Sequence, residues 1–350
     1  MRNNIHSLIE KYRTLFLPDI GTFFNDDVEL AIRMVGQLSD AKIPVIKAEI
    51  LHDVNICLKT NLSEFYYSPS NDGMIEESYR DVIERKIVSL DAYEKIFHHV
   101  KKKGCELVVS VYDNEGAAFA IEHGVLAIKI ASSNITHQPL IKYVAKTDRT
   151  VILDTGHSSL EEISRAVNWL NDEGKFDIII QHSPLAPPVS VGEHNLKFMQ
   201  TLGASFGIPY GLSDHHIGEE MLYAAAALGA SIVEKGICPD ELGDEQDRAH
   251  ALNISQAAKV QNNINNIAQA LGSGSRKLDR KRDKYISRMG LVAKVDIQKG
   301  SILTEKNVTF AFPVIGIPVE HTEFFLGKII KKSISAGEPI KSNNFFNAKN

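Results

Sequence analysis

Eight apolar segments, each followed by an amphipathic helical segment, constrain the fold of this chain more than any other feature of its sequence. The apolar segments are continuous runs rich in Val, Ile and Leu, without the alternation of a half-exposed sheet. Strands of this kind are typical of parallel sheets that helices cover on both faces. The segments are residues 16–21, 43–50, 105–112, 125–132, 150–156, 176–183, 208–215 and 231–236.

Eight strand-helix units predict a closed (β/α)₈ TIM barrel, which takes about 250 residues. An open, doubly wound sheet is the alternative. No GxGxxG motif opens the first helix, however, and about six strands are enough for that fold. The polar stretch YYSPSNDG at 66–73 is expected to be a loop between the second strand and its helix.

The alternation of strand and helix segments ends at GSGSRKLDRKRDKY, whose Gly, Ser and alternating charges indicate a linker. We therefore predict a barrel domain at 1–272, a linker at 273–286 and a small β-rich domain at 287–350. The last segment contains a weak internal repeat, in which GSILTEKN at 300–307 resembles GEPIKSNN at 337–344. Two similar turn-strand units predict a compact, pseudo-symmetric β domain.

Composition excludes several classes of function. The net charge of −5 and the pI of about 6.2 argue against binding to nucleic acid or to an anionic membrane surface. The basic cluster at 276–285 is interleaved with Asp and fits a solvated linker better than a polyanion site. No apolar run is long enough to span a membrane, no signal-peptide core is visible, and the three Cys are widely spaced. These features predict a cytoplasmic protein without disulfides.

Polar or ionisable residues end every predicted strand. In a barrel, these ends converge on one rim, where the following loops are free for chemistry. One or two such endings would be ordinary helix caps, but eight on one rim predict a pocket. The residues concerned are Asp19, Lys47, Glu49, Ser110, Tyr112, Lys129, Ser132, Asp154, Thr155, His157, His182, Ser183, Ser213, Asp214, His215, His216, Glu234 and Lys235.

Lys47 and Lys129 are the most informative of these residues because each lies inside an apolar strand, in VIKAEI and AIKIAS. An unpaired buried ammonium costs several kcal/mol. One such lysine is explained by a stem that lies on the barrel and a tip that reaches water. Two of them beside Ser110, Ser132 and Ser213 favour a site for a phosphate or carboxylate anion.

The motif GLSDHHIG at 211–218 places two imidazoles where the seventh strand meets its helix. A neutral histidine among carboxylates is a candidate metal ligand or acid/base. As an isolated pair, His215 and His216 are equally compatible with covering the end of the helix.

Six segments of the chain form a further pattern: KIASSN (129–134), DTGHSSLEEI (154–163), APP (186–188), GLSDHHIG (211–218), AALGASIVEK (226–235) and LVAKVDIQKGSILTEKNV (291–308). Together these segments resemble the sialic acid synthase family over nearly the whole chain. The resemblance implies a (β/α)₈ barrel followed by an antifreeze-like SAF domain. It also implies condensation of phosphoenolpyruvate with an N-acetylated hexose to a nonulosonic acid for surface polysaccharide, and a homodimer in which one protomer's SAF domain covers the partner's barrel.

The resemblance also assigns roles to individual residues. Asp247 is expected to contact the acceptor amino sugar, and Arg288 to reach the partner's sugar site from the SAF domain. His215 is expected to be one of two histidines that bind a divalent ion such as Mn²⁺ or Mg²⁺, and no organic cofactor is implied. The phosphoenolpyruvate site is carried over to Lys47, Ser110, Lys129, Ser132 and Ser213.

The sequence departs from the family pattern at several positions. The second metal histidine is Gly236, and a carboxylate two residues after Ser132 is Asn134. Asp154 replaces a serine that touches phosphate, Asp19 replaces a glutamate and Glu49 replaces a glutamine. An Asn and a Tyr after the sixth strand are Leu185 and Pro187.

These departures leave the function open between three hypotheses. The first is a phosphoenolpyruvate-dependent transferase with His215, Asp19 and Asn134 at the reacting centre. Its metal is bound weakly or not at all, with His182, His216 and His157 as candidate substitutes for the missing ligand. The second is a non-catalytic or repurposed paralogue that binds a sugar phosphate or carboxylate. A metal-dependent aldolase is the third.

Overall fold

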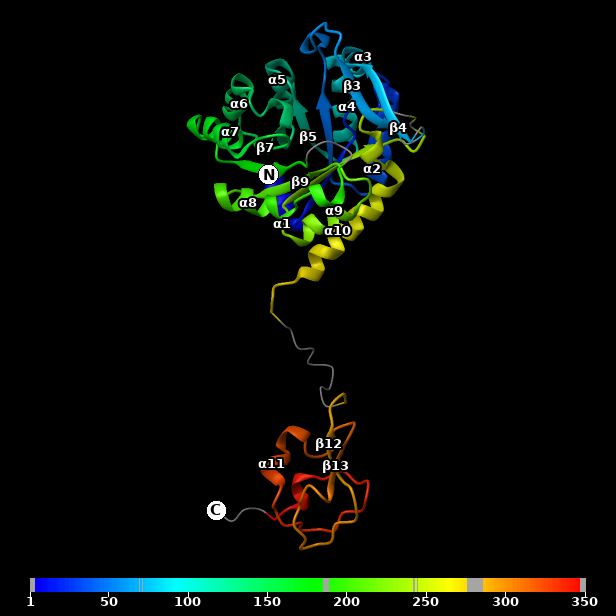
Figure 1. Cartoon of the computed structure of the whole chain (residues 1–350), viewed down its shortest axis with the longest axis vertical. Coiled ribbons are helices and arrows are strands. Elements are labelled where there is room, and N and C mark those ends of the chain that lie inside the picture. The colour runs from blue at the N-terminus through cyan, green and yellow to red at the C-terminus, as the bar shows by residue number, and fades with distance from the viewer. Residues whose placement is uncertain are drawn as a thin grey trace. The chain divides into compact units, whose positions relative to one another are not determined.

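The computed structural model describes residues 4–68, 70, 72–184, 189–241, 243, 245–275 and 286–346. The chain divides into two compact units, Met1–Ser273 and Gly274–Asn350 (Figure 1). Within the described residues, no helix is both long and apolar enough to cross a membrane.

The first unit is a closed barrel of parallel strands, as predicted. Neighbouring strands pair in chain order, and the first strand pairs with the last through Leu15 and Ile232, which closes the sheet. The barrel strands are β1 (Leu15–Asp19), β2 (Val45–Ile50), β5 (Glu106–Val111), β6 (Ala127–Ile130), β7 (Thr150–Asp154), β8 (Ile178–His182), β9 (Tyr210–Asp214) and β10 (Ile232–Cys238).

Helices follow the strands and surround the barrel (Figure 1). A large cluster of buried side chains fills the layer between helices and strands, so both faces of the sheet are covered. The helices are α2 (Val28–Asp40), α3 (Tyr79–Glu84), α4 (Leu90–Lys102), α5 (Asn114–Glu122), α6 (Gln138–Ala145), α7 (Leu160–Asp172), α8 (Lys197–Phe206), α9 (Glu220–Ala227) and α10 (Ala257–Leu271).

The register of the strands divides the barrel interior into an apolar and a polar part. Leu15, Leu17, Val45 and Ala127 belong to an inner apolar cluster, which also contains Ile5 from an additional helix, α1 (Ile5–Tyr12). Because side chains alternate between the two faces of a strand, residues two positions further along β1, β2 and β6 face the same interior. These residues include Asp19, Lys47 and Lys129, so an apolar floor supports a polar mouth.

The expectation of a loop over all of 66–73 was wrong in part, because residues 66–68 and Gly73 belong to strands. Residues Ser63–Ser68 form β3, which pairs antiparallel with β4 (Gly73–Ser78) in a hairpin between β2 and α3. Most side chains of this hairpin are half-exposed or exposed. It therefore lacks the continuous apolar run by which the barrel strands were recognised.

The second unit is small and β-rich. Its strands β12 (Gly290–Ala293) and β13 (Val308–Ala311) pair antiparallel, and single β-bridges connect most of the remaining segments. A separate core contains Leu291, Leu303 and Ile340, and a short helix, α11 (Thr322–Phe325), packs against it. Gly300 and Gly337, the first residues of the two repeated segments, have φ angles of 87° and 83°, which side chains rarely tolerate.

Candidate functional site

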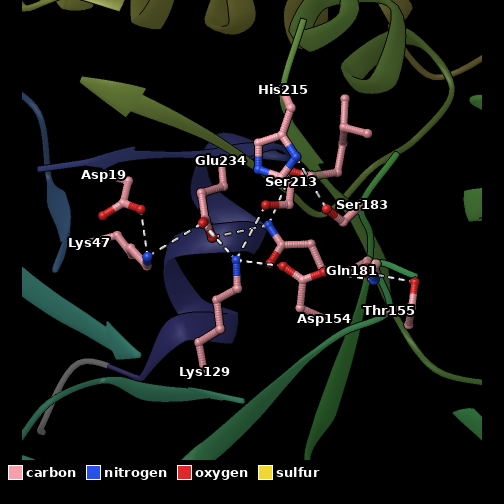
Figure 2. A network of polar contacts seen from close by, with 12 residues as sticks. Asp19, Lys47, Lys129, Asp154, Thr155, Gln181, Ser183, Ser213, His215 and Glu234 are labelled. Atoms are coloured by element: carbon pink, nitrogen blue, oxygen red, sulfur yellow. Dashed lines mark hydrogen bonds and ion pairs between the residues drawn. The ribbon is translucent and has the colours of Figure 1, made fainter. Parts of the chain in front are cut away.

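A hollow of about 160 Å³ lies at the carboxyl ends of the barrel strands. Its wall is mostly polar, and the central ionisable groups point toward one another (Figure 2). Of the residues singled out in the sequence, the structure brings these to the hollow: Asp19, Glu49, Ser110, Lys129, Ser132, Asp154, Ser213, Asp214, His215, Glu234, Lys235, Gly236 and Asp247.

Lys47 is one centre of the polar network and is almost fully buried. Its Nζ lies 2.5 Å from Asp19 Oδ2, 2.5 Å from Glu49 Oε1 and 3.6 Å from Glu234 Oε1. The hydroxyl of Tyr112 donates to the other oxygen of Glu49 at 2.7 Å. Carboxylates of the protein therefore neutralise this lysine, a pairing that was not foreseen from the sequence.

Lys129 is the second centre and is paired in the same way. Its Nζ lies 2.8 Å from Asp154 Oδ2 and 2.6 Å from Glu234 Oε1, and it donates to Ser213 Oγ at 3.3 Å. Gln181 Nε2 donates to the second oxygen of Glu234 at 3.2 Å. Glu234 thus connects the two lysines, and Figure 2 shows both ammonium groups converging on it.

Burial and charge shift the pKa values of this network in opposite directions. Burial raises the pKa of Asp19 to about 7 although Lys47 opposes the shift. Burial acts in the same direction on Glu234, but Lys129 and Lys47 together lower its pKa to about 2. The pKa of Lys47 is raised, because the surrounding carboxylates outweigh the effect of its burial. Asp19 is therefore the member of the network that changes its charge near neutral pH.

Ser110 offers an unused hydroxyl to the hollow. Its Oγ is buried, and it has no hydrogen-bond partner among the described residues. An unsatisfied buried hydroxyl costs about 1–3 kcal/mol, so such groups in native proteins call for an explanation. Because Ser110 lines the same hollow as Lys129 and Ser213, a ligand with acceptor oxygens explains it.

His215 lies at the mouth beside a histidine that sequence reasoning missed. Its ring centre is 4.9 Å from that of His250, and the two rings meet edge to face. Burial, and next to it the charge of His250, lower the pKa of His215 to about 4. Burial likewise lowers the pKa of His250 to about 3. Both imidazoles are therefore neutral at physiological pH.

The other histidines proposed as metal ligands have different contacts. His182 Nε2 lies 2.8 Å from the carbonyl oxygen of His194, and His216 Nε2 lies 3.6 Å from Glu220 Oε2. His157 has a φ angle of 54° on the loop after β7. None of the three lines the hollow that contains His215.

A side chain at position 236 would crowd its neighbours. A Cβ atom there would lie 3.1 Å from the ring of Phe23 and 3.4 Å from Cβ of Ala251. Among the described residues, no three His, Cys, Asp or Glu side chains are grouped so that they could bind a metal ion. The side chains present therefore do not fit the divalent ion that the family resemblance implies.

The contacts of Asp214 explain one of the polar residues in the motif GLSDHHIG. Its Oδ2 lies 2.8 Å from Lys235 Nζ, and its Oδ1 accepts a hydrogen bond from the backbone N–H of His216 at 3.0 Å. Burial would raise the pKa of Asp214, but His194 and Lys235 lower it. Asp214 therefore fixes the loop that presents His215.

A second hollow adjoins the first; Asn134 lines only the second, and Asp247 lines both. Arg288 belongs to the second unit, where its guanidinium lies 3.7 Å from Glu320 Oε2 with both side chains half exposed. Leu185 and Pro187 are outside the described residues. Sequence reasoning also missed Gln181 and Lys86. The alternation of side chains along β8 indicates that Gln181 points into the barrel. No pattern in the sequence indicates that Lys86 lines the site.

Fold and site together define a (β/α)₈ barrel protein with a buried carboxylate–lysine network at the strand ends and a separate small β unit. Two family models match the chain: the NeuB family over residues 34–276 and the SAF domain over residues 288–345. The chain therefore belongs to the NeuB family, and the predicted kinship to sialic acid synthases is confirmed.

Individual relatives agree with this assignment. The N,N'-diacetyllegionaminic acid synthase of Campylobacter jejuni is 32% identical over 94% of this chain and 99% of the relative. A pseudaminic acid synthase of the same species is 25% identical over 95% and 97%. The crystal structure of an N-acetylneuraminic acid synthetase from Leptospira borgpetersenii in complex with citrate has a TM-score of 0.67 at 24% identity. That match covers 77% of this chain and 88% of the other.

Proposed function

We propose that this protein condenses phosphoenolpyruvate with an N-acetylated, hexose-type aldehyde to give a nonulosonic acid. The observation that carries the proposal is the buried Lys129, which donates to Ser213 and lines the same hollow as the hydroxyl of Ser110, which has no partner among the described residues. Charged donors in a site shielded from water stabilise anions much more strongly than they do in water. The similarity to an N,N'-diacetyllegionaminic acid synthase and to a pseudaminic acid synthase supports the same reaction.

In this reaction, C3 of phosphoenolpyruvate attacks the aldehyde carbon, water adds to C2, and phosphate leaves. Lys47 and Lys129 stabilise the carboxylate and phosphate charges during these steps. Neutral His215 donates a hydrogen bond toward the aldehyde oxygen. Asp19, whose pKa burial raises to about 7, exchanges a proton with the reacting groups, because a general acid or base works best near its own pKa.

We further infer that the aldehyde is activated by protein side chains and not by a bound divalent ion. Position 236 is a glycine, where a Cβ would meet the ring of Phe23 at 3.1 Å, and the ring of His250 lies against His215. Among the described residues, no three His, Cys, Asp or Glu side chains are grouped to bind a metal ion, and a divalent ion with fewer than three protein ligands is weakly held.

The test of the proposed reaction is the release of phosphate from phosphoenolpyruvate, measured across a panel of N-acetylhexosamines. We expect release that depends on the acceptor and is lost in Lys129→Ala. Absence of release with every acceptor, at protein concentrations close to those of the substrates, would contradict the proposal.

A non-catalytic binder of a sugar phosphate or carboxylate is the second candidate. It is favoured by Asp154, which already neutralises Lys129 at 2.8 Å, and by Asn134, whose amide cannot act as a general acid or base. This candidate predicts saturable anion binding, seen by calorimetry, without any phosphate release from phosphoenolpyruvate.

We also propose that the protein is a homodimer in which the second unit of one copy packs on the barrel mouth of the other. Among the described residues, eleven large hydrophobic side chains of residues 286–346 are exposed, including Phe310, Phe312 and Phe324. Such density on a small unit is typical of an interaction surface. A monomeric mass by light scattering at micromolar concentration would contradict the proposal.

A further inference from the structure

A segment on one side of the barrel mouth, residues 245–250, carries three of the residues that line the polar hollow. They are Gln246, Asp247 and His250. The segment follows β10, and its regular structure is a single turn of 3₁₀ helix, η4 (Arg248–His250). Asp247 has a φ angle of 67°, in the left-handed region that residues with a side chain rarely adopt. Fixing the backbone of one residue costs about 1–2 kcal/mol of conformational entropy, so specific contacts are needed to hold this segment in place.

The side chain of Glu245, the first residue of the segment, makes several of these contacts. It is almost fully buried, with an exposed fraction of 5%. Its carboxylate accepts two hydrogen bonds from the guanidinium of Arg85, from Nη2 to Oε1 at 2.5 Å and from Nε to Oε2 at 3.0 Å. The amide of Asn25 donates to Oε2 at 3.3 Å, and the backbone N–H of Gln246 donates to Oε1 at 2.8 Å. Two parallel bonds to a planar guanidinium fix the direction of a carboxylate as well as its distance.

Arg85 is itself held from its other side. It follows α3 directly, and its Nη1 donates to Oε1 of Glu77 on β4. The second oxygen of Glu77 accepts a hydrogen bond from the hydroxyl of Tyr66 on β3 at 2.9 Å. Burial would raise the pKa of Glu245, but Arg85 lowers it, so Glu245 is charged in this contact. Arg85 therefore connects the hairpin of β3 and β4 to the segment at the mouth.

The segment serves a different part of the site from the buried lysines. Lys129 and Ser213, which form the proposed anion site, belong to β6 and β9 and do not depend on residues 245–250 for their position. Asp247 is acidic and His250 is neutral, so neither attracts phosphoenolpyruvate. Arg85 is not among the described residues that line the hollow. The segment therefore serves the uncharged substrate of the proposed reaction, and Arg85 acts on that substrate only through the segment.

We propose that Arg85 is a positioning residue, which orients Glu245 and thereby holds Asp247 and His250 at the barrel mouth for binding of the acceptor. This inference rests on the proposed condensation and adds a residue outside the hollow on which acceptor binding depends. Without the guanidinium, the carboxylate of Glu245 loses its closest cation, since Lys86 Nζ lies 3.9 Å away. A buried charge without a partner is costly, so the segment leaves its place at the mouth.

Hydrogen exchange of the full chain without ligands, measured by mass spectrometry, tests the position of the segment. The backbone N–H of Arg248 donates to the carbonyl of Glu245 at 3.0 Å, and that of His250 donates to the carbonyl of Asp247 at 3.3 Å. In Arg85→Ala we expect exchange over residues 246–251 to become at least about tenfold faster, with exchange in α7 unchanged. Glu245→Gln keeps the shape of the side chain but removes its charge, and it should change exchange in the same direction.

Two comparisons separate the paired geometry from a general loss of structure. Guanidinium chloride at millimolar concentration should restore protection in Arg85→Ala, whereas ammonium chloride at the same ionic strength should not, because only guanidinium reproduces the planar fork of donors. Arg80→Ala is the matched control. It removes another arginine of α3, whose Nε lies 2.6 Å from Glu84 Oε1, and it should leave residues 246–251 protected.

The release of phosphate measures the consequence for the reaction. In Arg85→Ala we expect the KM for the acceptor to rise at least about fivefold and the KM for phosphoenolpyruvate to change by less than about twofold, because the segment contributes to the binding of one substrate only. Arg80→Ala should leave both KM values unchanged.

Unchanged exchange over residues 246–251 in Arg85→Ala and Glu245→Gln would overturn the inference. So would equal restoration of protection by ammonium and guanidinium, or an equal rise of both KM values. The exchange measurements need no turnover, so they decide the inference even in a protein that releases no phosphate. Failure of the proposed reaction and failure of this inference are therefore distinguishable.

Discussion

Replacement of Asp154 by serine is expected to strengthen the binding of anions in the barrel mouth. Asp154 Oδ2 lies 2.8 Å from Lys129 Nζ, and the side chain is almost fully buried. An anion that approaches Lys129 therefore shares the ammonium with a carboxylate fixed beside it. The substitution Asp154→Ser would remove that charge and leave a hydroxyl able to donate to the anion.

The size of the effect follows from the geometry. Two unit charges about 4 Å apart interact by about 4 kcal/mol at an effective dielectric constant of about 20. Part of this gain is lost because Lys129 also loses a partner, although Glu234 remains 2.6 Å from its Nζ. We expect a net gain of at least about 1.4 kcal/mol, which is tenfold in Kd. The same change removes half of a buried ion pair, so the variant is expected to melt at a lower temperature in the absence of anions.

Calorimetric titration of phosphoenolpyruvate and of sulfate into wild type and Asp154→Ser measures this effect. Asp172→Ser, which removes a carboxylate at the end of α7, away from the barrel mouth, controls for the change in total charge. Equal or weaker binding in Asp154→Ser, with unchanged binding in the control, would show that Lys129 is not the anion site.

Four further outcomes are expected. Burial raises the pKa of Asp19 to about 7, so this carboxyl gains a proton as the pH falls from about 8 to about 6. Sulfate, whose charge stays constant, should therefore bind more tightly at the lower pH. The variant Asp19→Asn should flatten this pH profile of sulfate binding. Lys129→Ala should weaken phosphoenolpyruvate binding by at least about 1.5 kcal/mol, measured by calorimetry, because a hydrogen bond to a charged group is lost. Phosphate release should survive EDTA but fall about 10²-fold or more in His215→Ala, whereas activity abolished by EDTA and restored by manganese would refute the role given to His215. A Cβ at Gly211 would lie 2.4 Å from Ile232 Cγ1 and 2.5 Å from the carbonyl oxygen of Ile232. Gly211→Ala should therefore lower the free energy of unfolding by about 1–3 kcal/mol. An unchanged denaturation midpoint would contradict this expectation.

The barrel could be predicted from the sequence because its information is local. Each barrel strand is a run of apolar residues. Because successive side chains of a strand point to opposite faces, every second residue points into the barrel. Lys47 follows Val45 by two positions, and Val45 lies in the inner apolar cluster. The alternation of the strand therefore indicates that the side chain of Lys47 points into the barrel. The hairpin of β3 and β4 was missed because its side chains are mostly half-exposed, which leaves little apolar periodicity to detect.

The partners of the site residues were less predictable, because they depend on contacts between distant segments. His215 and His250 are separated by 35 positions, yet their ring centres are 4.9 Å apart. The pairing of Lys129 with Glu234 likewise joins strands that are not adjacent in the barrel. No spacing rule connects such residues. The sequence indicates which groups point inward, and the geometry of the closed barrel decides which of them meet.

The charges at the barrel mouth and the lack of a grouped set of metal ligands among the described residues have one consequence in common. A reaction that places negative charge on an aldehyde oxygen needs either a cation or a proton donor beside that oxygen. Lys47 and Lys129 are held among carboxylates, and the described residues include no group of three side chains that could bind a metal ion. Proton donors are left for this role. Asp19, whose pKa burial raises to about 7, supplies a proton that is exchangeable near neutral pH, and neutral His215 supplies an N–H. If the chain is a synthase, its rate should therefore follow the protonation of Asp19 more closely than the concentration of any divalent ion.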